Sequence, residues 1–252
     1  MINLKEKIHN QEVVIGTWNT IGSSNVTKIV ASAGFDFQII DLEHGPFVIE
    51  DIHNHVASSS YFECPCLVRI PRNSDWMALQ VLDQGANGII VPQISNKNDA
   101  EKFVKNTKYY PLGTRGFSPF TFAGSYNNEP GYVEQKNKTL INVIIIESLE
   151  GINNIDQILE INHIDVVYLG AFDLSKELAI PGDIYNKKLV DLIKKCVVKI
   201  NASKRIAGSF VPHNIDEVKF CLDIGLKFIT YSLDSHRLRS SFLNDLELIR
   251  KL

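Results

Sequence analysis

Residues 33–45 read Ala-Gly-Phe-Asp-Phe-Gln-Ile-Ile-Asp-Leu-Glu-His-Gly, and this stretch decides the fold. A helical pattern ends at Gly34, a strand-like run follows over 37–41, and polar residues begin where that run ends. The same pattern, a glycine between a helical stretch and a strand-like run, recurs at Gln84-Gly85-Ala86-Asn87 and at Ile224-Gly225-Leu226-Lys227. Because glycine suits the left-handed position that ends a helix, each phrase predicts a helix passing into a strand.

The rest of the chain alternates in the same way between short β-branched runs and longer helical patterns. Strands are expected over 13–18, 37–41, 66–69, 88–91, 142–147, 166–169, 205–209 and 228–232. Helices are expected over 25–32, 48–59, 76–83, 99–107, 152–160, 189–201, 215–223 and 238–251. A helix between successive strands makes a right-handed crossover, so the sheet is parallel. Eight such units predict a TIM (β/α)8 barrel, built as a single domain over residues 1–252.

Composition narrows the kinds of partner. Of 252 residues, 44% are apolar, and 29 acidic against 26 basic side chains give a formal charge of −3. No basic block or stripe is present, which argues against nucleic acid as a partner. Residues 1–11 are too polar for a signal peptide and no apolar run is long enough to cross a bilayer, so we expect a cytoplasmic protein without a membrane partner. The four cysteines form no zinc framework and are expected to be ordinary thiols.

The stretch 92–140 is too long for a simple crossover between strands. After the helix expected to end at residue 107 it contains Tyr-Tyr-Pro-Leu-Gly-Thr-Arg-Gly-Phe over 109–117. A long loop on an otherwise economical barrel predicts either a lid or an arm between subunits.

Polar side chains gather where the expected strands end, which is where TIM barrels carry their active sites. They are Asp41, Glu43, His44, Arg69, Gln93, Glu147, Asp173, Ser232 and Asp234. No expected strand ends in lysine, so we do not expect a Schiff base. The sequence therefore predicts that carboxylates, a histidine and an arginine converge on one rim of the barrel.

Glu147 closes the apolar run 143–146, where an unpaired charge is expensive and requires a partner. Asp173, which follows a turn containing Gly170, is positioned to supply a second oxygen ligand. Two carboxylates with a chelating keto acid and water make the oxygen-rich shell that Mg²⁺, Mn²⁺ or Co²⁺ accepts. Two alternatives stay open, which are a salt bridge from Glu147 to Arg69 and an N-cap role for Asp173.

Arg69 presents a planar fork of donors that can hold a carboxylate or a developing enolate oxygen, although a structural ion pair would also place it there. His44 is the natural proton-transfer group, because it is the histidine that follows a strand and has acidic neighbours. Trp18 ends the first expected strand and is either part of the core or next to the site.

Several of these motifs together resemble one known family over nearly the whole chain, in order and with similar spacing. They are Gly16-Thr17-Trp18, Ala33-Gly34-Phe35-Asp36, Asp41-Leu42-Glu43-His44-Gly45-Pro46, Leu67-Val68-Arg69, Leu82-Asp83-Gln84-Gly85, Val91-Pro92-Gln93, Arg115-Gly116 and Gly170-Ala171-Phe172-Asp173-Leu174-Ser175. The sequence is similar to the HpcH/HpaI aldolases, which are metal-dependent class II pyruvate aldolases. The resemblance implies a barrel of the phosphoenolpyruvate/pyruvate-binding type and a homo-oligomer, usually a hexamer built as a trimer of dimers.

The resemblance also implies roles for individual residues. The metal carboxylates fall on Glu147 and Asp173, the enolate-stabilising arginine on Arg69, and the proton-transferring histidine on His44. The substrate-binding positions fall on Trp18, Arg69, Gly170, Ala171, Phe172 and Asp173. The aspartate that pairs with the histidine falls on Asp83, which ends a helix at the bottom of the barrel. We therefore expect that pair to form across a subunit interface.

Two departures from the family pattern bear on activity. Ile145 stands where the family commonly has a glutamine, and Phe122 and Ser125 stand where related sequences often carry arginine. We expect reversible cleavage of a 4-hydroxy-2-keto acid to pyruvate, or a similar 2-keto acid, and an aldehyde. The alternatives are an enzyme that condenses the same enolate with an acyl-thioester or another keto acid, and a non-catalytic descendant that only binds a 2-keto acid.

Overall fold

The computed structural model describes residues 4–212 and 214–252, and its strands close into a barrel in chain order, β1 to β8. Every neighbouring pair is parallel, including the closing pair of β1 and β8. The strands are β1 Val14–Asn19, β2 Phe37–Asp41, β3 Cys66–Arg69, β4 Gly88–Val91, β5 Ile141–Ile146, β6 Val166–Leu169, β7 Ile206–Val211 and β8 Phe228–Leu233. The predicted TIM (β/α)8 barrel is confirmed.

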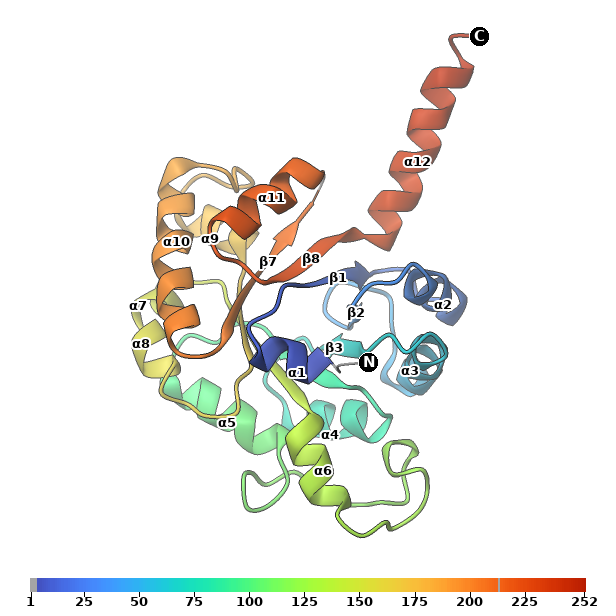
Figure 1. The fold of residues 1–252 in the computed structure, drawn as a ribbon, viewed down its shortest axis with the longest axis vertical. Helices are drawn as coiled ribbons and strands as arrows, with labels where there is room; N and C mark the ends of the chain where they lie inside the picture. Colours follow the sequence, from blue (N-terminus) through green and yellow to red (C-terminus); the bar gives the residue numbers. More distant parts are fainter. Residues whose placement is uncertain (1–3, 213) are drawn as a thin grey trace.

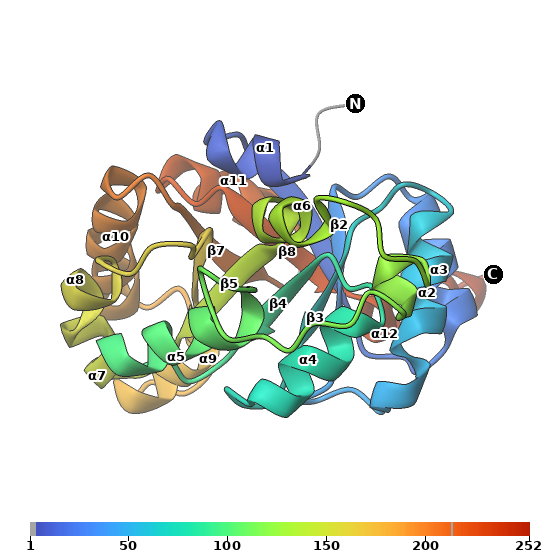
Figure 2. The same cartoon turned by 90° about the horizontal axis from the view of Figure 1, so that it is seen from below.

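Helices lie outside the strands (Figures 1 and 2). They are α1 Leu4–His9, α2 Ser24–Ser32, α3 Ile52–Ser60, α4 Asp75–Asp83, α5 Lys97–Thr107, α6 Tyr132–Thr139, α7 Leu149–Asn153, α8 Ile155–Ile158, α9 Ala171–Glu177, α10 Lys187–Ala202, α11 Ile215–Asp223 and α12 Asp234–Ile249, with 3-10 turns η1 Ile49–Asp51 and η2 Phe122–Gly124. Gly34, Gly85 and Gly225 have φ of +87°, +91° and +92°, so the predicted left-handed helix ends are confirmed.

Some helices differ from those predicted from the sequence. A single helix was expected over 152–160, but α7 begins earlier, at Leu149 after the Ser148 cap, and ends at Asn153, and the separate helix α8 begins at Ile155. The helices α1 and α6 were not predicted, and α9 entered only as the helix that Asp173 would cap. Only Tyr132 is buried in α6, so that helix lacks the apolar periodicity by which a sequence reveals one.

Two apolar clusters hold the fold together. One fills the barrel, where Phe37 and Phe228 stack with ring centroids 4.1 Å apart, and Leu4 and Ile8 of α1 join it from the amino end. The other lies between the sheet and the outer helices. The strands are buried on both faces, which explains why β5 is an almost continuous β-branched run.

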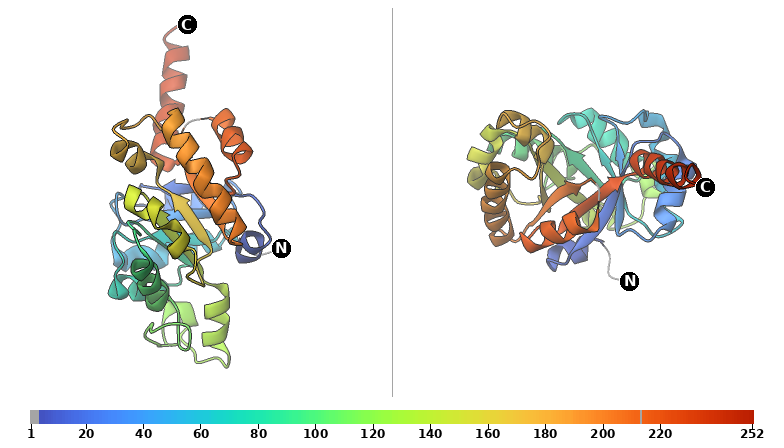
Figure 3. Two further views of the ribbon diagram at one scale, coloured as in Figure 1. Left: turned by 90° about the vertical axis from the view of Figure 1, so that its left-hand side faces the viewer. Right: turned by 90° about the horizontal axis from the view of Figure 1, so that it is seen from above.

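The last helix, α12, points away from the barrel (Figures 1 and 3). Its apolar residues are exposed, and Phe242 has 62% of its surface accessible. The start of α12 is fixed because Asp234 accepts hydrogen bonds from the backbone of Thr20 and Ile21. An exposed apolar surface of this kind is typical of an interaction site.

The long stretch 92–140 contains α5, η2 and α6. None of its residues lines the cavity at the carboxyl ends of the strands, so a lid over the chain's own site is not observed. In the described part of the chain, no helix is long and apolar enough to cross a membrane.

Candidate active site

A cavity of about 290 Å³ opens at the carboxyl ends of the strands. Its wall contains most of the predicted site residues together with several apolar side chains. The lining residues are Trp18, Asp41, His44, Arg69, Ile145, Glu147, Tyr168, Gly170, Ala171, Phe172, Asp173, Phe210 and Leu233. Its volume is close to the lower end of the usual range for small-molecule pockets, about 300–1,000 Å³.

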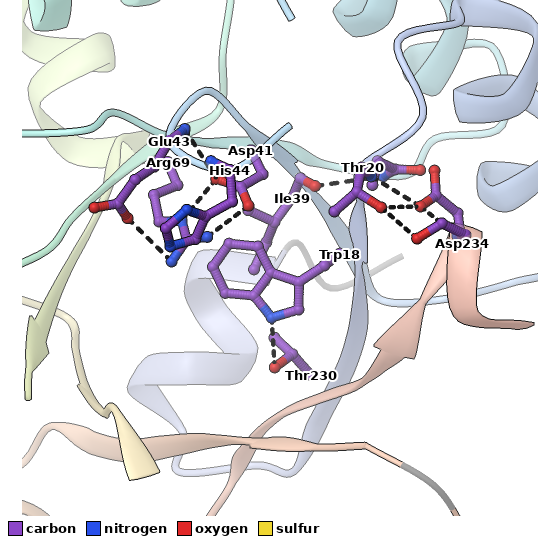
Figure 4. Close-up of polar contacts among 11 residues, drawn as sticks. Trp18, Thr20, Ile39, Asp41, Glu43, His44, Arg69, Thr230 and Asp234 are labelled. Carbon is purple, nitrogen blue, oxygen red and sulfur yellow. Dashed lines mark hydrogen bonds and ion pairs between the residues drawn. The ribbon is translucent and has the colours of Figure 1, made fainter. Parts of the chain in front are cut away.

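Arg69, at the end of β3, is held by two carboxylates, one from Asp41 at the end of β2 and one from Glu43 just after it (Figure 4). Its Nε and Nη2 donate to the two oxygens of Asp41 at 2.8 and 2.5 Å, and its Nη1 lies 3.2 Å from Glu43. The structural ion pair considered from the sequence is therefore present. The guanidinium also lines the cavity, and with five N–H donors it keeps donors for a ligand.

Asp41 organises the loop that carries His44. Besides holding Arg69, its Oδ1 accepts hydrogen bonds from the backbone N–H groups of Glu43 and His44, at 3.0 and 3.2 Å. The His44 side chain is exposed at the rim, and no described side chain contacts its ring through a hydrogen bond. The ring is thus free to meet a substrate.

Trp18 forms the floor beneath Arg69. The guanidinium carbon lies 4.5 Å from the centre of the indole ring, within the range of a cation–π contact. The indole N–H donates to Thr230 at 2.9 Å, and Thr230 also contacts the hydroxyl of Tyr168. Trp18 is 5% exposed, so it belongs both to the barrel core and to the cavity wall.

Glu147 follows β5 and is half-buried beside other carboxylates. Burial, and then the charges of Asp173 and Glu43, raise the pKa of Glu147 to about 7. The backbone N–H of Gln93 donates to its Oε1 at 3.1 Å. It makes no ion pair with Arg69, which bonds Asp41 and Glu43 instead, so the salt-bridge alternative for Glu147 is wrong.

Asp173 sits in the first turn of α9. The N-cap of that helix is Gly170, so the N-cap alternative for Asp173 is also wrong. Its carboxylate lies 3.1 Å from the ammonium group of the exposed Lys176. The absence of a side chain at Gly170 lets the backbone lie close to Glu147. A Cβ at this position would lie 2.6 Å from the Cβ and 3.1 Å from Oε2 of Glu147. The backbone thus shapes a cradle around Glu147.

The donor set at this rim suits a hard divalent cation. Glu147 and Asp173 both line the cavity, and burial together with the charges of neighbouring carboxylates makes ionised Glu147 costly without a positive partner. Among the residues described, no group of three or more histidine, cysteine or carboxylate side chains has the arrangement of a metal site. A cation here would therefore take two oxygens from the chain and the rest from substrate and water.

Asp83 lies apart from the other predicted site residues. It ends α4 beside the start of β4, and its carboxylate accepts a hydrogen bond from Arg115 at 2.6 Å. It does not line the cavity. A contact with His44 within one chain is thus absent, as expected from its position at the bottom of the barrel.

Sequence reasoning missed part of the site. It placed Asp41 on the rim but did not identify it as the partner of Arg69, although both residues end adjacent, paired strands. Phe210 and Leu233 also line the cavity, and the ring of Phe210 lies 6.1 Å from that of Phe172. Nothing in an apolar strand sequence distinguishes such residues from core.

The chain is similar in sequence and in fold to known proteins over nearly its whole length. The 2-keto-3-deoxy-L-rhamnonate aldolase of Salmonella gallinarum is 29% identical over 232 residues, which cover 92% of this chain and 86% of the relative. The crystal structure of an HpcH/HpaI aldolase from Desulfitobacterium hafniense matches with a TM-score of 0.93 and 25% identity, over 100% of this chain and 98% of that one. The citrate synthase SbnG matches with a TM-score of 0.89 and 25% identity, over 100% and 98%.

The statistical model of the HpcH/HpaI aldolase/citrate lyase family matches residues 15–241. The resemblance found in the sequence is confirmed, as is the expected enzyme class, a carbon–carbon lyase of the aldolase type. The chain belongs to the HpcH/HpaI aldolase/citrate lyase family.

Proposed function

We propose that this protein is a divalent-metal-dependent aldolase that reversibly cleaves a 4-hydroxy-2-keto acid to pyruvate, or a similar 2-keto acid, and an aldehyde. The observation that carries the proposal is Glu147, a carboxylate with its pKa raised to about 7 beside Asp173 in a cavity that also contains Arg69. Glu147 and Asp173 would hold Mg²⁺, Mn²⁺ or Co²⁺. When bound, the cation supplies a positive charge that favours the enolate of the keto acid.

Arg69 binds the keto acid and stabilises negative charge as it develops on the enolate oxygen. Asp41 fixes one edge of the guanidinium through Nε and Nη2, so the remaining donors are oriented before the substrate arrives. Preorganised donors of this kind stabilise a transition state without reorganising. Trp18 supports the guanidinium from below and excludes water from that side.

His44 moves the proton. In the cleavage direction its ring accepts the proton of the 4-hydroxyl group, the oxygen on carbon 4 becomes the aldehyde carbonyl, and the electron pair of the bond between carbons 3 and 4 passes to carbon 3. The pyruvate enolate then takes a proton at carbon 3. The exposed, unbonded ring of His44 at the rim supports this role.

The wall of the cavity bears on the choice of substrate. Gly170, Ala171 and Phe172 line the cavity at the start of α9, and Ile145 contributes an apolar surface where the family pattern has an amide. Short aldehydes without a charged end fit such a wall better than acidic ones, because a buried carboxylate without a partner is costly.

Retro-aldol assays on a panel of 4-hydroxy-2-keto acids, each with Mg²⁺, Mn²⁺ and Co²⁺, test the proposal. We expect metal-dependent release of pyruvate that a chelator abolishes. The same panel with Glu147→Ala should show no rescue by any metal. Turnover that survives both the chelator and this substitution would disprove the metal-dependent mechanism.

A second candidate is condensation of the same enolate with a keto-acid acceptor. This candidate is supported by the structural match to a citrate synthase, which is 25% identical over the full chain. Both activities require an enolate, so the discriminating result is which acceptor, an aldehyde or a keto acid, gives turnover.

We also propose that the protein works as a homo-oligomer, and a hexamer built as a trimer of dimers is the form that the family resemblance implies. The exposed apolar residues of α12 support self-association, because a second copy would cover them. In that assembly Asp83 of one copy would approach His44 of another. Light scattering on the purified protein tests the assembly, and a monomer at micromolar concentration would contradict it. A cytoplasmic location stays a prediction from the sequence.

A further inference from the structure

A second cavity, of about 740 Å³, lies at the amino ends of β5, β6 and β7, at the end of the barrel opposite Glu147. Asp165 and Arg205 line it directly before β6 and β7 begin. Lys5 enters from α1 and Lys108 from the turn after α5. None of the residues proposed above for aldol chemistry takes part in it.

The wall of this cavity carries an excess of positive charge. Five lysine and arginine side chains line it, namely Lys5, Lys108, Lys138, Lys204 and Arg205, against two carboxylates. The chain as a whole carries a formal charge of −3, so this concentration is local. A cavity with one sign of charge and low-dielectric walls raises the local concentration of oppositely charged ligands.

Asp165 neutralises only part of that charge. It pairs with Lys5 at 2.6 Å and with His9 at 3.3 Å. Although burial opposes its ionisation, the hydrogen bond from His9 and the charge of Lys5 hold the pKa of Asp165 below its ordinary value. The direct partners of this carboxylate are therefore Lys5 and His9, and its charge acts on Lys108 and Arg205 only from a greater distance.

Lys108 is a buried ammonium group whose hydrogen-bond partners are backbone carbonyl oxygens. It is 1% exposed, and its Nζ donates to the backbone carbonyls of Asn137 and Leu140 at 2.6 and 3.3 Å. Lys5 donates to the same Leu140 oxygen at 2.7 Å, so two cationic groups share one acceptor. Within residues 4–212 and 214–252, no carboxylate lies at ion-pair distance from Lys108. Burial, and then the charge of Lys5, lower the pKa of Lys108 to about 8.

Arg205, like Lys108, is a buried cation whose hydrogen-bond partners are carbonyl oxygens. It is 9% exposed, and its two terminal nitrogens donate to the carbonyls of Ser203 and Ile161 at 3.2 and 2.5 Å. Its Nε is buried and has no hydrogen-bond partner in the described chain. Carbonyl oxygens satisfy hydrogen bonds but do not neutralise the charge, so a buried guanidinium of this kind favours a nearby anion.

We propose that this cavity binds a small phosphate monoester, with the phosphate group held by Lys108, Arg205 and the rim lysines Lys138 and Lys204. The excess is greater than one charge, so a dianion matches it better than a monocarboxylate. Lysine ammonium groups serve as point charges for phosphate. The volume exceeds what a bare phosphate needs and lies within the range of small-molecule pockets, and Leu112 and Leu159 offer an apolar wall to the organic part.

Isothermal titration calorimetry on the purified full chain tests this, with glycerol 3-phosphate, inorganic phosphate, glycerol and acetate at one ionic strength set by chloride. We expect saturable binding of one glycerol 3-phosphate per chain, weaker binding of inorganic phosphate, and none of glycerol or acetate. Equal affinity for the two phosphates would overturn the place given to the organic part. Absence of saturable binding by either would overturn the site.

Two variants and a matched control locate the binding. The double substitution K138A/K204A removes two exposed rim charges and should weaken binding by about tenfold, and K108M by about 10- to 100-fold, as expected for the loss of a hydrogen bond to a charged group. The control K194A/K195A removes two exposed lysines of α10, outside the cavity. If the control loses as much affinity as the rim variant, binding is nonspecific and the site is disproved. Because the rim residues are exposed, the rim variant answers the question even if K108M does not fold.

Discussion

The two ends of the barrel carry opposite charge excesses. At the carboxyl end, Glu147 lies among other carboxylates and its pKa rises to about 7. At the amino end, Lys108 lies near other cations and its pKa falls to about 8. In both places burial is the first cause, and a neighbour of like charge adds to it. Each cavity wall therefore carries a charge excess, which is negative at the carboxyl end and positive at the amino end.

The largest effect is expected at Glu147. Replacing it with alanine removes one of two chain ligands for the cation, so kcat/KM for retro-aldol cleavage should fall by about a thousandfold, a loss comparable to removing a principal transition-state charge. Steady-state kinetics across a metal titration measure it. Glu150→Ala, an exposed carboxylate three residues on, is the control and should keep normal activity. An equal loss of kcat/KM in both variants would mean that Glu147 has no special role at the carboxyl end of the barrel.

Arg69→Lys should have the next largest effect. Lysine keeps the positive charge but loses the planar fork that Asp41 and Glu43 hold, so kcat should fall by about a hundredfold while metal binding persists. Single-turnover rates together with Mn²⁺ binding separate the two properties. Arg72→Lys, at an exposed arginine on the following loop, should resemble the unmodified enzyme. Unchanged kcat in Arg69→Lys would remove Arg69 from the chemistry.

A smaller effect is expected at Gly170. Alanine there would bring its Cβ to 2.6 Å from the Cβ of Glu147, so the carboxylate must shift. We expect metal affinity to fall by about tenfold, which corresponds to about 1.4 kcal/mol. Gly116→Ala, where the nearest atom to a new Cβ lies 3.7 Å away, controls for adding a methyl group. Matching affinities in the two variants would argue against the Gly170 cradle.

The last expected effect leaves catalysis unchanged and concerns the pH dependence of stability that Lys108 produces. Lys108 faces Lys5 from α1, Asp165 before β6 and Arg115 from the following loop. Its pKa is about 8 in the folded protein and near 10.5 ordinarily, so between these values the unfolded chain holds a proton that the folded chain has released. The free energy of unfolding should therefore rise with pH across that window, by up to about 1.4 kcal/mol per pH unit.

Lys108→Met should lose this rise. Urea unfolding of both proteins in chloride buffer, at several pH values between 8 and 10.5, measures the difference between their slopes. Parallel curves for the two proteins would mean that Lys108 does not titrate abnormally. The comparison between the two ends would then rest on Glu147 alone.

Most of the barrel could be predicted from local patterns. The motifs around Gly34, Gly85 and Gly225 predicted helix ends, and the β-branched runs predicted strands. Both patterns depend only on residues that are near each other in the sequence. The helix α6 could not be found in this way, since only Tyr132 in it is buried. Nor could the course of α12, whose apolar residues are exposed in a single chain.

The candidate site could be predicted only in part. Polar residues after strands marked His44, Arg69 and Glu147, because parallel strand ends meet at one rim. The pairing of Asp41 with Arg69 depends on strand register, which no single run encodes. The basic cavity escaped notice because Lys5, Lys108 and Arg205 are far apart in sequence and meet only when the barrel closes.

The central claim is that a divalent cation held by Glu147 and Asp173 allows the chain to form a pyruvate enolate. Exchange of deuterium from solvent into the methyl group of pyruvate, followed by NMR, tests it without knowledge of the aldehyde. We predict exchange that requires Mg²⁺, Mn²⁺ or Co²⁺, stops on adding a chelator, and is absent in Glu147→Ala. No exchange with any of these metals, or exchange that persists after chelation, would contradict the account.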